Sequence, residues 1–440
     1  MKYSIVLYPS PGIGHLVSMV ELGRHILEHD PSFFITIFIT PSPLNTCYST
    51  GLYISRISST TPSITFHHLP AISISPDSIS SPHPESLIFE VLRCNNPNIH
   101  QAFLTISQTS TIQAFIIDTF CSSSVDVAAS FNLPIYYFIT SGAAVLCALL
   151  YFPTIHKNTT KSFKDLGSTL LDIPGVPSIP ACDMVKPVLD RNDDTYQRFL
   201  DFFIRMPEAN GILINTFESL EPRALKALSA GLCVPCRSTP PVYCVGPIIA
   251  DRTGVEGDSS WVREERAKVF VVVRNPPTDD ISWRNLAPPE PDLDALLPEG
   301  FLERTKDRGF IVKSWAPQID VLCRKSVGGF VTHCGWNSVL EAVWAGVPMV
   351  AWPLYAEQRM NRIFMVEEIK LAMPMNELEN GFVSATEVEK RVRGLMDSDE
   401  GKALRERIIA LRDAAVVATS EGGSSRAALA KVAELWKSSS

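Results

Sequence analysis

The sequence predicts an α/β fold with two Rossmann-like domains that face each other across a cleft. Short apolar runs typical of buried strands alternate with segments whose apolar residues recur at helical spacing, and residues 4–9 and 15–28 are the first such pair. The same alternation starts again near residue 267. Alternation of this kind builds mainly parallel sheets covered by helices on both faces, and ligands then bind beyond the carboxyl ends of the strands.

Each half contributes its own series of elements. Strands are expected at residues 4–9, 33–40, 63–69, 114–120, 134–140, 211–217 and 241–246, and then at 267–273, 309–315, 328–334 and 347–353. Helices are expected at residues 15–28, 85–106 with an interruption at Pro97, 123–132 and 141–152, and then at 336–345, 357–370, 384–396, 400–418 and 423–437.

The order of these elements divides the chain into a first domain at residues 1–246, a linker at 247–266 and a second domain at 267–420. Residues 421–440 are expected to form a last helix that packs back on the first domain. Two long Pro-rich stretches, at residues 70–86 and 158–190, read as loops. Loops of that length in an α/β domain are usually functional or mobile.

The composition excludes several classes of protein. Of the 440 residues, 45% are hydrophobic and 20% are charged, which is typical of a globular protein with large cores. The net charge of −8 leaves no basic surface for displacing counterions from a nucleic acid. No apolar run reaches the roughly 18 residues of a membrane span, and the first residues lack the apolar core of a signal peptide. We therefore expect a cytoplasmic monomer without a membrane span.

The ten cysteines are scattered along the chain. Cys233 and Cys236 form a C-x-x-C pair, but no second pair and no pair of histidines stands at the spacing of a zinc site. Neither do the acidic residues cluster as metal ligands do. Reduced thiols and no metal site are the expectation.

The stretch VTHCGWNSVLEA, residues 331–342, joins a buried strand directly to a helix that begins near Asn337 or Ser338. Ser338 and Glu341 fit the S-x-x-E pattern of a capping box, which is the purely structural interpretation. A helix N-terminus also offers free N–H groups and the positive end of the helix dipole to an anion. Because a capping box accounts for neither His333 nor Trp336, the stretch predicts a site for a diphosphate.

Residues 315–358 as a whole resemble the 44-residue signature box of plant secondary-product glycosyltransferases, which use UDP-sugars. The opening PSPGIGHLVSMVELGR is also similar to that family, most of all to the branch that acts on flavonoids, isoflavones and chalcones. The resemblance implies the GT-B arrangement of two facing Rossmann-like domains. It also implies an enzyme with UDP-glucose as co-substrate, no metal cofactor and a small phenolic acceptor as its other partner.

The resemblance gives each matching residue of the box a role in holding the donor. Trp315 is implied to stack on uracil and Ala316 to meet the edge of the base. Gln318 and Glu341 are implied to bind the ribose hydroxyls, a role that would prevent Glu341 from completing the capping box. The phosphates are assigned to His333, Asn337 and Ser338, and the sugar to Trp336, Glu357 and Gln358. Glutamine at the last box position accompanies glucose in the family.

His15 and Asp118 are the implied catalytic pair. His15 follows PGIG at a strand-to-helix turn, and Asp118 stands near the end of an expected strand. A histidine at a helix start is often structural, and an aspartate at a strand end is often a cap. The family places its general base at His15, where the helix N-terminus is expected to keep the imidazole neutral. Asp118 would then fix the tautomer of the ring. The implied reaction is one displacement with inversion, which gives a β-glycoside.

An acceptor pocket for a flat phenolic should be apolar and lined by aromatic side chains. For each candidate, packing in the core is an equally good explanation. The candidates are Phe120, Phe152, Met184, Phe199 and Phe202.

The sequence departs from the family in one place. Between the linker and VFVVVRNP the family carries another strand, a phosphate-binding loop and a helix, and this strand–helix unit of roughly 30 to 40 residues is missing. Either the strand at 267–273 moves into the vacant central place or a sheet edge stays open. The alternative function is therefore a UDP-sugar binder with impaired catalysis. A dinucleotide oxidoreductase is disfavoured because GIGHLV lacks the third glycine of G-x-G-x-x-G.

Overall fold

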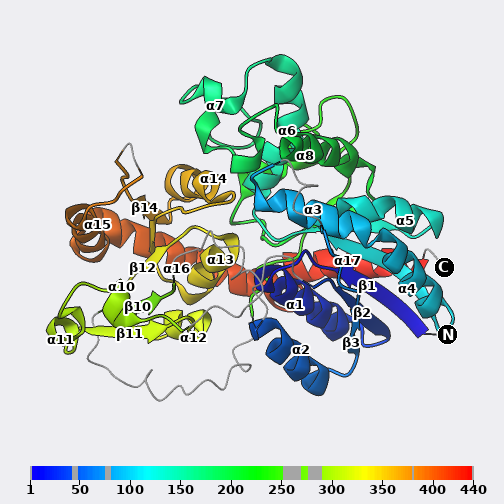
Figure 1. The fold of residues 1–440 in the computed structure, drawn as a ribbon, viewed down its shortest axis with the longest axis horizontal. Helices are drawn as coiled ribbons and strands as arrows, with labels where there is room; N and C mark the ends of the chain where they lie inside the picture. The colour runs from blue at the N-terminus through cyan, green and yellow to red at the C-terminus, as the bar shows by residue number, and fades with distance from the viewer. Residues whose placement is uncertain are drawn as a thin grey trace.

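The computed structural model describes residues 2–41, 48–74, 81–250, 269–275, 290–378 and 381–438. Two α/β domains lie side by side, the first coloured blue to green and the second yellow to orange (Figure 1). No helix in these ranges is both long and apolar enough to cross a membrane. Residues 251–266 of the expected linker and 75–80 of the first expected loop lie outside the described residues.

The first domain is built on one seven-stranded parallel sheet with the order β3-β2-β1-β4-β5-β8-β9. Its strands are β1 (Lys2–Tyr8), β2 (Phe33–Ile39), β3 (Ile64–His68), β4 (Ser110–Asp118), β5 (Ile135–Ile139), β8 (Gly211–Ile214) and β9 (Val242–Cys244). The strand order reverses between β1 and β4. Because ligands bind at such a switch point, the chain segments that leave β1 and β4 are placed for chemistry.

The sheet is buried on both faces, as the continuous apolar strands predict. On one face Val6 and Phe115 join a core with α3, α4, α6 and α8; on the other Ile5 and Ile116 join a core with α1 and α17. The helices of this domain are α1 (Ile13–His29), α2 (Tyr48–Thr60), α3 (Pro84–Cys94), α4 (Asn96–Ser107), α5 (Val125–Ser130), α6 (Ala143–Asn158), α7 (Phe163–Leu166), α8 (Asp194–Arg205) and α9 (Pro222–Ser229). The short strands β6 (Leu170–Leu171) and β7 (Ile179–Pro180) pair antiparallel inside the second long loop.

The second domain carries two separate parallel sheets in its described residues. One has the order β10-β11 and the other β12-β13-β14. The strands are β10 (Val269–Val273), β11 (Gly309–Lys313), β12 (Phe330–Thr332), β13 (Met349–Ala351) and β14 (Ala372–Pro374). The helices are α10 (Leu293–Leu296), α11 (Phe301–Thr305), α12 (Gln318–Leu322), α13 (Trp336–Ala345), α14 (Gln358–Ile363), α15 (Ala385–Asp397) and α16 (Asp399–Thr419).

Strand β10 is apolar and, among the described residues, is paired along one edge only. It pairs with β11 from Val269 to Val273, and no pairing with β12 exists among the described residues. Val269 is 54% exposed, and Val271 and Val272 are 36% and 38% exposed. Of the two outcomes considered for a missing central strand, the described residues show the open edge and no pairing of β10 with β12.

The last helix, α17 (Ser424–Ser438), packs on the first domain. In Figure 1 this red helix runs among the blue elements, and the two chain ends lie close together. Trp436 is fully buried and meets the rings of Phe33 and Tyr136 at centroid distances of 6.2 and 5.6 Å. The Ser425 hydroxyl donates to the carbonyl of Gly246 over 2.6 Å. The end of the chain thus ties the second domain back to the first.

Several details differ from the sequence-based expectation, among them the helices α2 and α8, which were not predicted. The helix expected across 85–106 breaks at Asn95 rather than at Pro97, because a proline in the first turn of α4 lacks an N–H that the turn does not need. Strand β14 was not predicted, since it is short and ends in Pro374 on a sheet edge. The helix expected at 357–370 is α14 followed by a π-helical turn, Phe364–Glu368.

Candidate active site

A histidine and a buried carboxylate meet at the switch point of the first sheet. His15 lies in the first turn of α1, and its Nδ1 is 2.8 Å from Oδ2 of Asp118, the last residue of β4. Asp118 is fully buried, whereas the side chain of His15 remains 33% exposed. The hydroxyl of Ser10 donates to the other carboxylate oxygen over 2.5 Å. Since the carboxylate accepts from Nδ1–H, Nε2 of His15 is left with a lone pair that can take a proton.

The electrostatics of His15 differ from the expectation of a helix-neutralised imidazole. Burial lowers the pKa of His15, but the charge and hydrogen bond of Asp118, together with the charge of Glu357, outweigh it, so the pKa is raised above its usual 6.5. Asp118 therefore favours the protonated ring, which is the form that a general base reaches after it has accepted a proton. Glu357 belongs to the second domain, so both domains act on this one imidazole.

The first turn of α13 is not a capping box. The N-cap is Gly335, no side chain caps the helix, and Ser338 is already its third residue. A Cβ on Gly335 would lie 2.4 Å from Nε2 of His333, so a larger residue there would displace the imidazole. The capping-box interpretation of Ser338 and Glu341 is therefore wrong. The N–H groups of this first turn have no partner within the helix and point to where an anion can bind.

Glu341 and Ser338 are joined instead through Gln318. The Gln318 side-chain amide donates to Ser338 Oγ over 2.9 Å and to Glu341 Oε2 over 2.7 Å. Burial raises the pKa of Glu341 to about 7, although the hydrogen bond from Gln318 acts in the opposite direction. Additional hydrogen-bond donors, such as a pair of vicinal hydroxyls, would stabilise the ionised form of this carboxylate.

His333 lies just before this turn and is held as a neutral ring. Its ring stacks on Tyr355 with centroids 6.3 Å apart. Burial lowers the pKa of His333, and the positive charge of Arg274 lowers it further. Arg274 stands at the end of β10, where its Nε donates to the carbonyl of Ser314 over 2.9 Å. The positive charge of Arg274 thus acts on the imidazole that stands just before the N-terminus of α13.

The predicted base-binding residues follow a strained turn. Ser314 has a φ of 62°, and it is followed by Trp315, which is 51% exposed, and by the buried Ala316. Cys334 and Ala356, with φ values of 68° and 52°, stand next to His333 and Glu357 in the same way. Each left-handed residue other than glycine costs about 1–3 kcal/mol and persists where the surroundings fix it. All three occur directly beside residues that the signature box assigns to the donor.

The two domains touch at the site itself. Asn337, in the first turn of α13, donates through its side-chain amide to Ser18 Oγ over 3.2 Å. Ser18 lies about one turn of α1 beyond His15. Ser141, just before α6, donates to Glu357 Oε1 over 3.2 Å. The first turn of α13 in one domain and the helix that carries the imidazole in the other are therefore in direct contact.

The Trp336 side chain is buried between the two domains. It is 2% exposed, and its Nε1 donates to the backbone carbonyl of Asn215 over 2.7 Å. A Cβ on Gly142 would lie 2.8 Å from the indole ring. The Trp336 side chain thus anchors the second domain on the first, and its contact with the sugar stays a prediction.

Glu357 and Gln358, the predicted sugar ligands, are the N-cap and the first residue of α14. The side-chain carbonyl of Gln358 accepts from the N–H groups of Leu354 and Tyr355, each over 2.9 Å. Glu357 Oε1 accepts from Asn361 as well as from Ser141. These bonds fix both side chains at the boundary between the two domains.

The predicted acceptor residues divide into two groups. Phe120 lies beside the base, with its ring centroid 6.2 Å from that of His15 and 5.9 Å from that of Phe199. Phe152 and Phe202 are core residues instead, 0% and 3% exposed, and pack on other rings of the first domain. Met184 is also buried, at 2% exposure. For Phe152, Phe202 and Met184 the structure thus favours the core-packing alternative.

Sequence reasoning missed several residues of the site. They are Ser10 on the carboxylate, Ser18 and Ser141 at the domain boundary, Phe89 beside Phe120 and Arg274 near His333. Serines carry little signal in a sequence without a motif around them. Arg274 follows an expected strand directly, and its position at a carboxyl end was the signal available.

Comparison with known proteins decides the family. The profile of the family described as UDP-glucoronosyl and UDP-glucosyl transferase matches residues 295–411. The anthocyanidin 5,3-O-glucosyltransferase of a Rosa hybrid cultivar is 46% identical, with 99% of each chain covered. The chain belongs to the plant secondary-product UDP-glycosyltransferases. A phloretin 2'-O-glucosyltransferase of Malus domestica is 45% identical over 96% of this chain and 97% of its own.

Solved structures place this UDP-glycosyltransferase among GT-B folds. A UDP-glucosyltransferase from Polygonum tinctorium that glucosylates indoxyl superposes with a TM-score of 0.87 at 30% identity, with 99% of each chain covered. Phytolacca americana UGT2, in complex with UDP-2-fluoro-glucose and pterostilbene, superposes with a TM-score of 0.85 at 33% identity and the same coverage. The chain is thus a glycosyltransferase of two Rossmann-like domains, as the sequence predicted.

Proposed function

We propose that this glycosyltransferase moves glucose from UDP-glucose to a phenolic hydroxyl of a flavonoid-like acceptor, with inversion at the anomeric carbon. The observation that carries the proposal is the contact between Asn337 and Ser18, which sets the anion-binding turn about one helical turn from the imidazole of His15. Gln358 at the end of the signature box and the glucosyltransferase names of the relatives support glucose as the sugar.

The reaction is a single displacement. Nε2 of His15 takes the proton of the acceptor hydroxyl, the oxygen forms a bond to the anomeric carbon, and the bond from that carbon to the phosphate oxygen breaks with its electron pair on UDP. Asp118 stabilises the imidazolium that forms. The charge on the departing diphosphate meets the N-terminus of α13, His333, Asn337 and Ser338.

Other residues of the signature box bind the base and the ribose of the nucleotide. Trp315 stacks on uracil, Ala316 meets the edge of the base, and Gln318 and Glu341 hold the ribose. The phenolic ring packs against Phe120, with Phe199 behind it. No step of this scheme requires a metal, because helix, histidine and amide groups supply the stabilising charge and hydrogen bonds.

The proposal is tested by incubating the protein with UDP-glucose and a panel of flavonoids, anthocyanidins and dihydrochalcones. UDP release and a product heavier by one hexose are expected for at least one acceptor, and the anomeric proton of that product should show the β configuration by NMR. Absence of UDP release with every acceptor contradicts the proposal.

A second function is favoured by one observation, the split of the second domain into two sheets. A central strand with a phosphate-binding loop between β10 and β12 would be the natural occupant of that place. A chain without it is a UDP-sugar binder with impaired turnover. Calorimetry separates the two functions: UDP binding without turnover favours the binder, and binding with turnover favours the enzyme.

The pH dependence of turnover should report His15. Because the neutral ring is the base and its pKa is raised, kcat/KM should fall as the pH decreases through a midpoint above 6.5. Asp118→Asn removes the largest upward influence, so the midpoint should move to lower pH while the rate drops. A simple phenol that titrates near pH 10 is the suitable acceptor, since it does not titrate in the same range. An unchanged midpoint in Asp118→Asn contradicts the assigned pairing.

UDP binding should release a proton from Glu341. Its pKa of about 7 in the free protein falls once ribose hydroxyls donate to the carboxylate, so binding tightens as the pH rises. We expect wild-type affinity to be about tenfold weaker at pH 6 than at pH 8, relative to Glu341→Gln measured in the same way. Calorimetry in buffers of different ionisation enthalpy measures the proton directly. Since Glu341→Gln shares His333 and the phosphates with the wild type, an equal pH dependence in both proteins refutes this role.

A further inference from the structure

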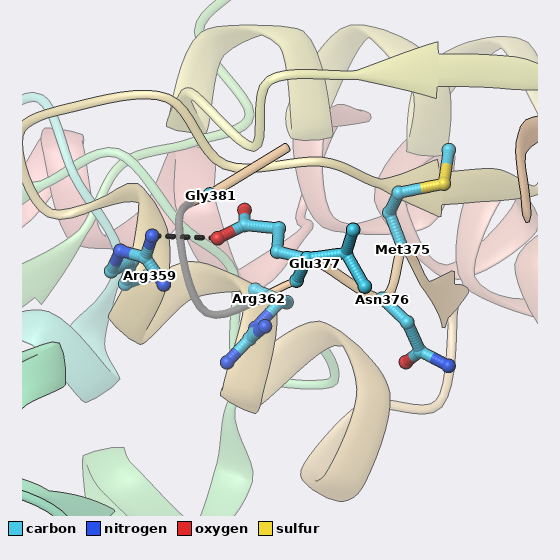
Figure 2. A pocket seen from close by; sticks show the side chains of 7 residues that line it. Arg359, Arg362, Met375, Asn376, Glu377 and Gly381 are labelled. Atoms are coloured by element: carbon cyan, nitrogen blue, oxygen red, sulfur yellow. Dashed lines mark hydrogen bonds and ion pairs between the residues drawn. The ribbon is translucent and has the colours of Figure 1, made fainter. Parts of the chain in front are cut away.

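A polar pocket lies beside the helix that carries the sugar-side residues. It has a volume of about 440 Å³ and is lined by residues of α14 and of the segment after β14, namely Arg359, Arg362, Met375, Asn376, Glu377, Leu378 and Gly381. Figure 2 shows the two arginines projecting from α14 and Arg359 reaching Glu377. The helix begins at Gln358, so the arginines stand one and four residues beyond a predicted sugar ligand.

Both arginines share one carboxylate of the first domain. Arg362 donates to Asp183 Oδ2 over 3.3 Å, and Nη1 of Arg359 is 3.6 Å from Asp183 Oδ1. Arg359 also donates to Glu377 over 2.8 Å. The four groups form a chain of alternating charge that crosses from one domain to the other.

Asp183 is a buried carboxylate, so its ion pairs with the two arginines affect how firmly the two domains are held together. It is 7% exposed, and it ends the 3₁₀ turn Ala181–Asp183 in the second long loop of the first domain. Met184, which packs in the core of the first domain, follows directly. A buried carboxylate without its cations is strongly unfavourable, whereas an exposed pair contributes little. The pairs with Arg359 and Arg362 therefore hold α14 against this loop more firmly than a surface contact would.

We propose that Asp183 is a positioning residue that sets the sugar-binding end of α14 against the second long loop of the first domain. Through Arg359 and Arg362 it fixes the direction of the helix that presents Glu357 and Gln358. The proposal rests on the proposed function for its kinetic effect, but its effect on sugar binding is independent of turnover.

The test compares Asp183→Asn with Arg223→Gln. Arg223, on α9 of the first domain, forms an ion pair of 2.8 Å with Glu368 in the π-helical turn after α14. The side chains of Arg223 and Glu368 are 54% and 31% exposed. Asp183→Asn should lower kcat/KM by about tenfold or more, because small misplacements of a sugar carry costs of that order. Arg223→Gln should stay within about twofold of wild type. The pH midpoint of His15 should remain unchanged in both variants.

Binding provides the readout that does not need turnover. The ratio of the Kd of UDP to that of UDP-glucose reports the contribution of the glucose, and Asp183→Asn should reduce this ratio while the Kd of UDP itself changes little. If wild type binds UDP-glucose but turns over no acceptor, the proposed function fails and this ratio still tests Asp183. Arg362→Gln leaves Asp183 the partner Arg359 and should show the same change in weaker form, which covers a folding failure of Asp183→Asn. Asp183→Glu should recover part of the loss.

Two outcomes overturn the proposal. One is a glucose contribution in both Asp183→Asn and Arg362→Gln that equals that of wild type. The other is an equal loss in Arg223→Gln, which would mean that any contact between the domains has the same effect.

Discussion

Replacing His15 by alanine is expected to lower kcat/KM for glucosyl transfer by about 100- to 10,000-fold, the range that a positioned general base contributes. The acceptor hydroxyl would then lose its proton to water, in a crevice where Asp118 has no imidazolium left to stabilise. UDP should still bind with nearly the wild-type Kd, because the proposed nucleotide-binding residues belong to the second domain. Coupled UDP release measures the rate, and calorimetry measures the affinity.

The matched control lies on the same helix. His29 stands in the last turn of α1, away from the switch point, and His29→Ala should leave kcat/KM within about twofold of wild type. Ser10→Ala removes the hydroxyl on Oδ1 of Asp118 and should give an intermediate loss. If His15→Ala retains more than about a tenth of the wild-type rate, then His15 is not the base.

Much of the fold follows from periodicity and punctuation. The continuous apolar strands of the first sheet are buried on both faces, and the helix at 336–345 was predicted with the bounds that it has. Both results come from local patterns, apolar runs and a glycine before a helix, that tertiary packing had no reason to override. Where packing decided, prediction failed: β14 is a three-residue strand that exists because β13 offers it an edge.

The same distinction between local patterns and tertiary contacts applies to the candidate site. Roles read from the signature box concern residues close in sequence, and Gln318, Ser338 and Glu341 are indeed joined by hydrogen bonds. The contacts between the domains carry no such signal. That Trp336 would bond to Asn215, or Asn337 to Ser18, depends on how two domains meet, and more than a hundred residues separate each pair in the sequence.

The aromatic residues show why composition alone cannot find a pocket. Phe199 and Phe202 are three residues apart on α8, and both are largely buried in the same core. Only Phe199 reaches Phe120, while Phe202 packs on Tyr137. The sequence pattern is equivalent for the two, so the neighbours on other elements decide which one stands near the base.

The second prediction with a large expected effect concerns the interrupted sheet of the second domain. The alignment with the rose glucosyltransferase spans 478 positions, 38 more than the 440 residues of this chain, while each chain is covered to 99%. The relative therefore carries additional residues within the aligned region. In this chain β10 exposes Val269, Val271 and Val272 and does not reach β12 within the described residues.

Inserting into this chain the residues that the rose relative carries between its counterparts of residues 250 and 269 should restore one continuous sheet. Covering three valines, each contributing about 1.5 kcal/mol or more when buried, and pairing two open strand edges should raise the free energy of unfolding by several kcal/mol. The Kd of UDP should fall as well, because backbone N–H groups of the added loop would meet the phosphates. Urea unfolding and calorimetry measure the two effects, and a Gly/Ser insert of the same length is the control. If the Gly/Ser insert stabilises the protein equally, or if neither insert changes the affinity for UDP, then the place between β10 and β12 is not that of a missing strand, and the open edge is a native feature of this chain.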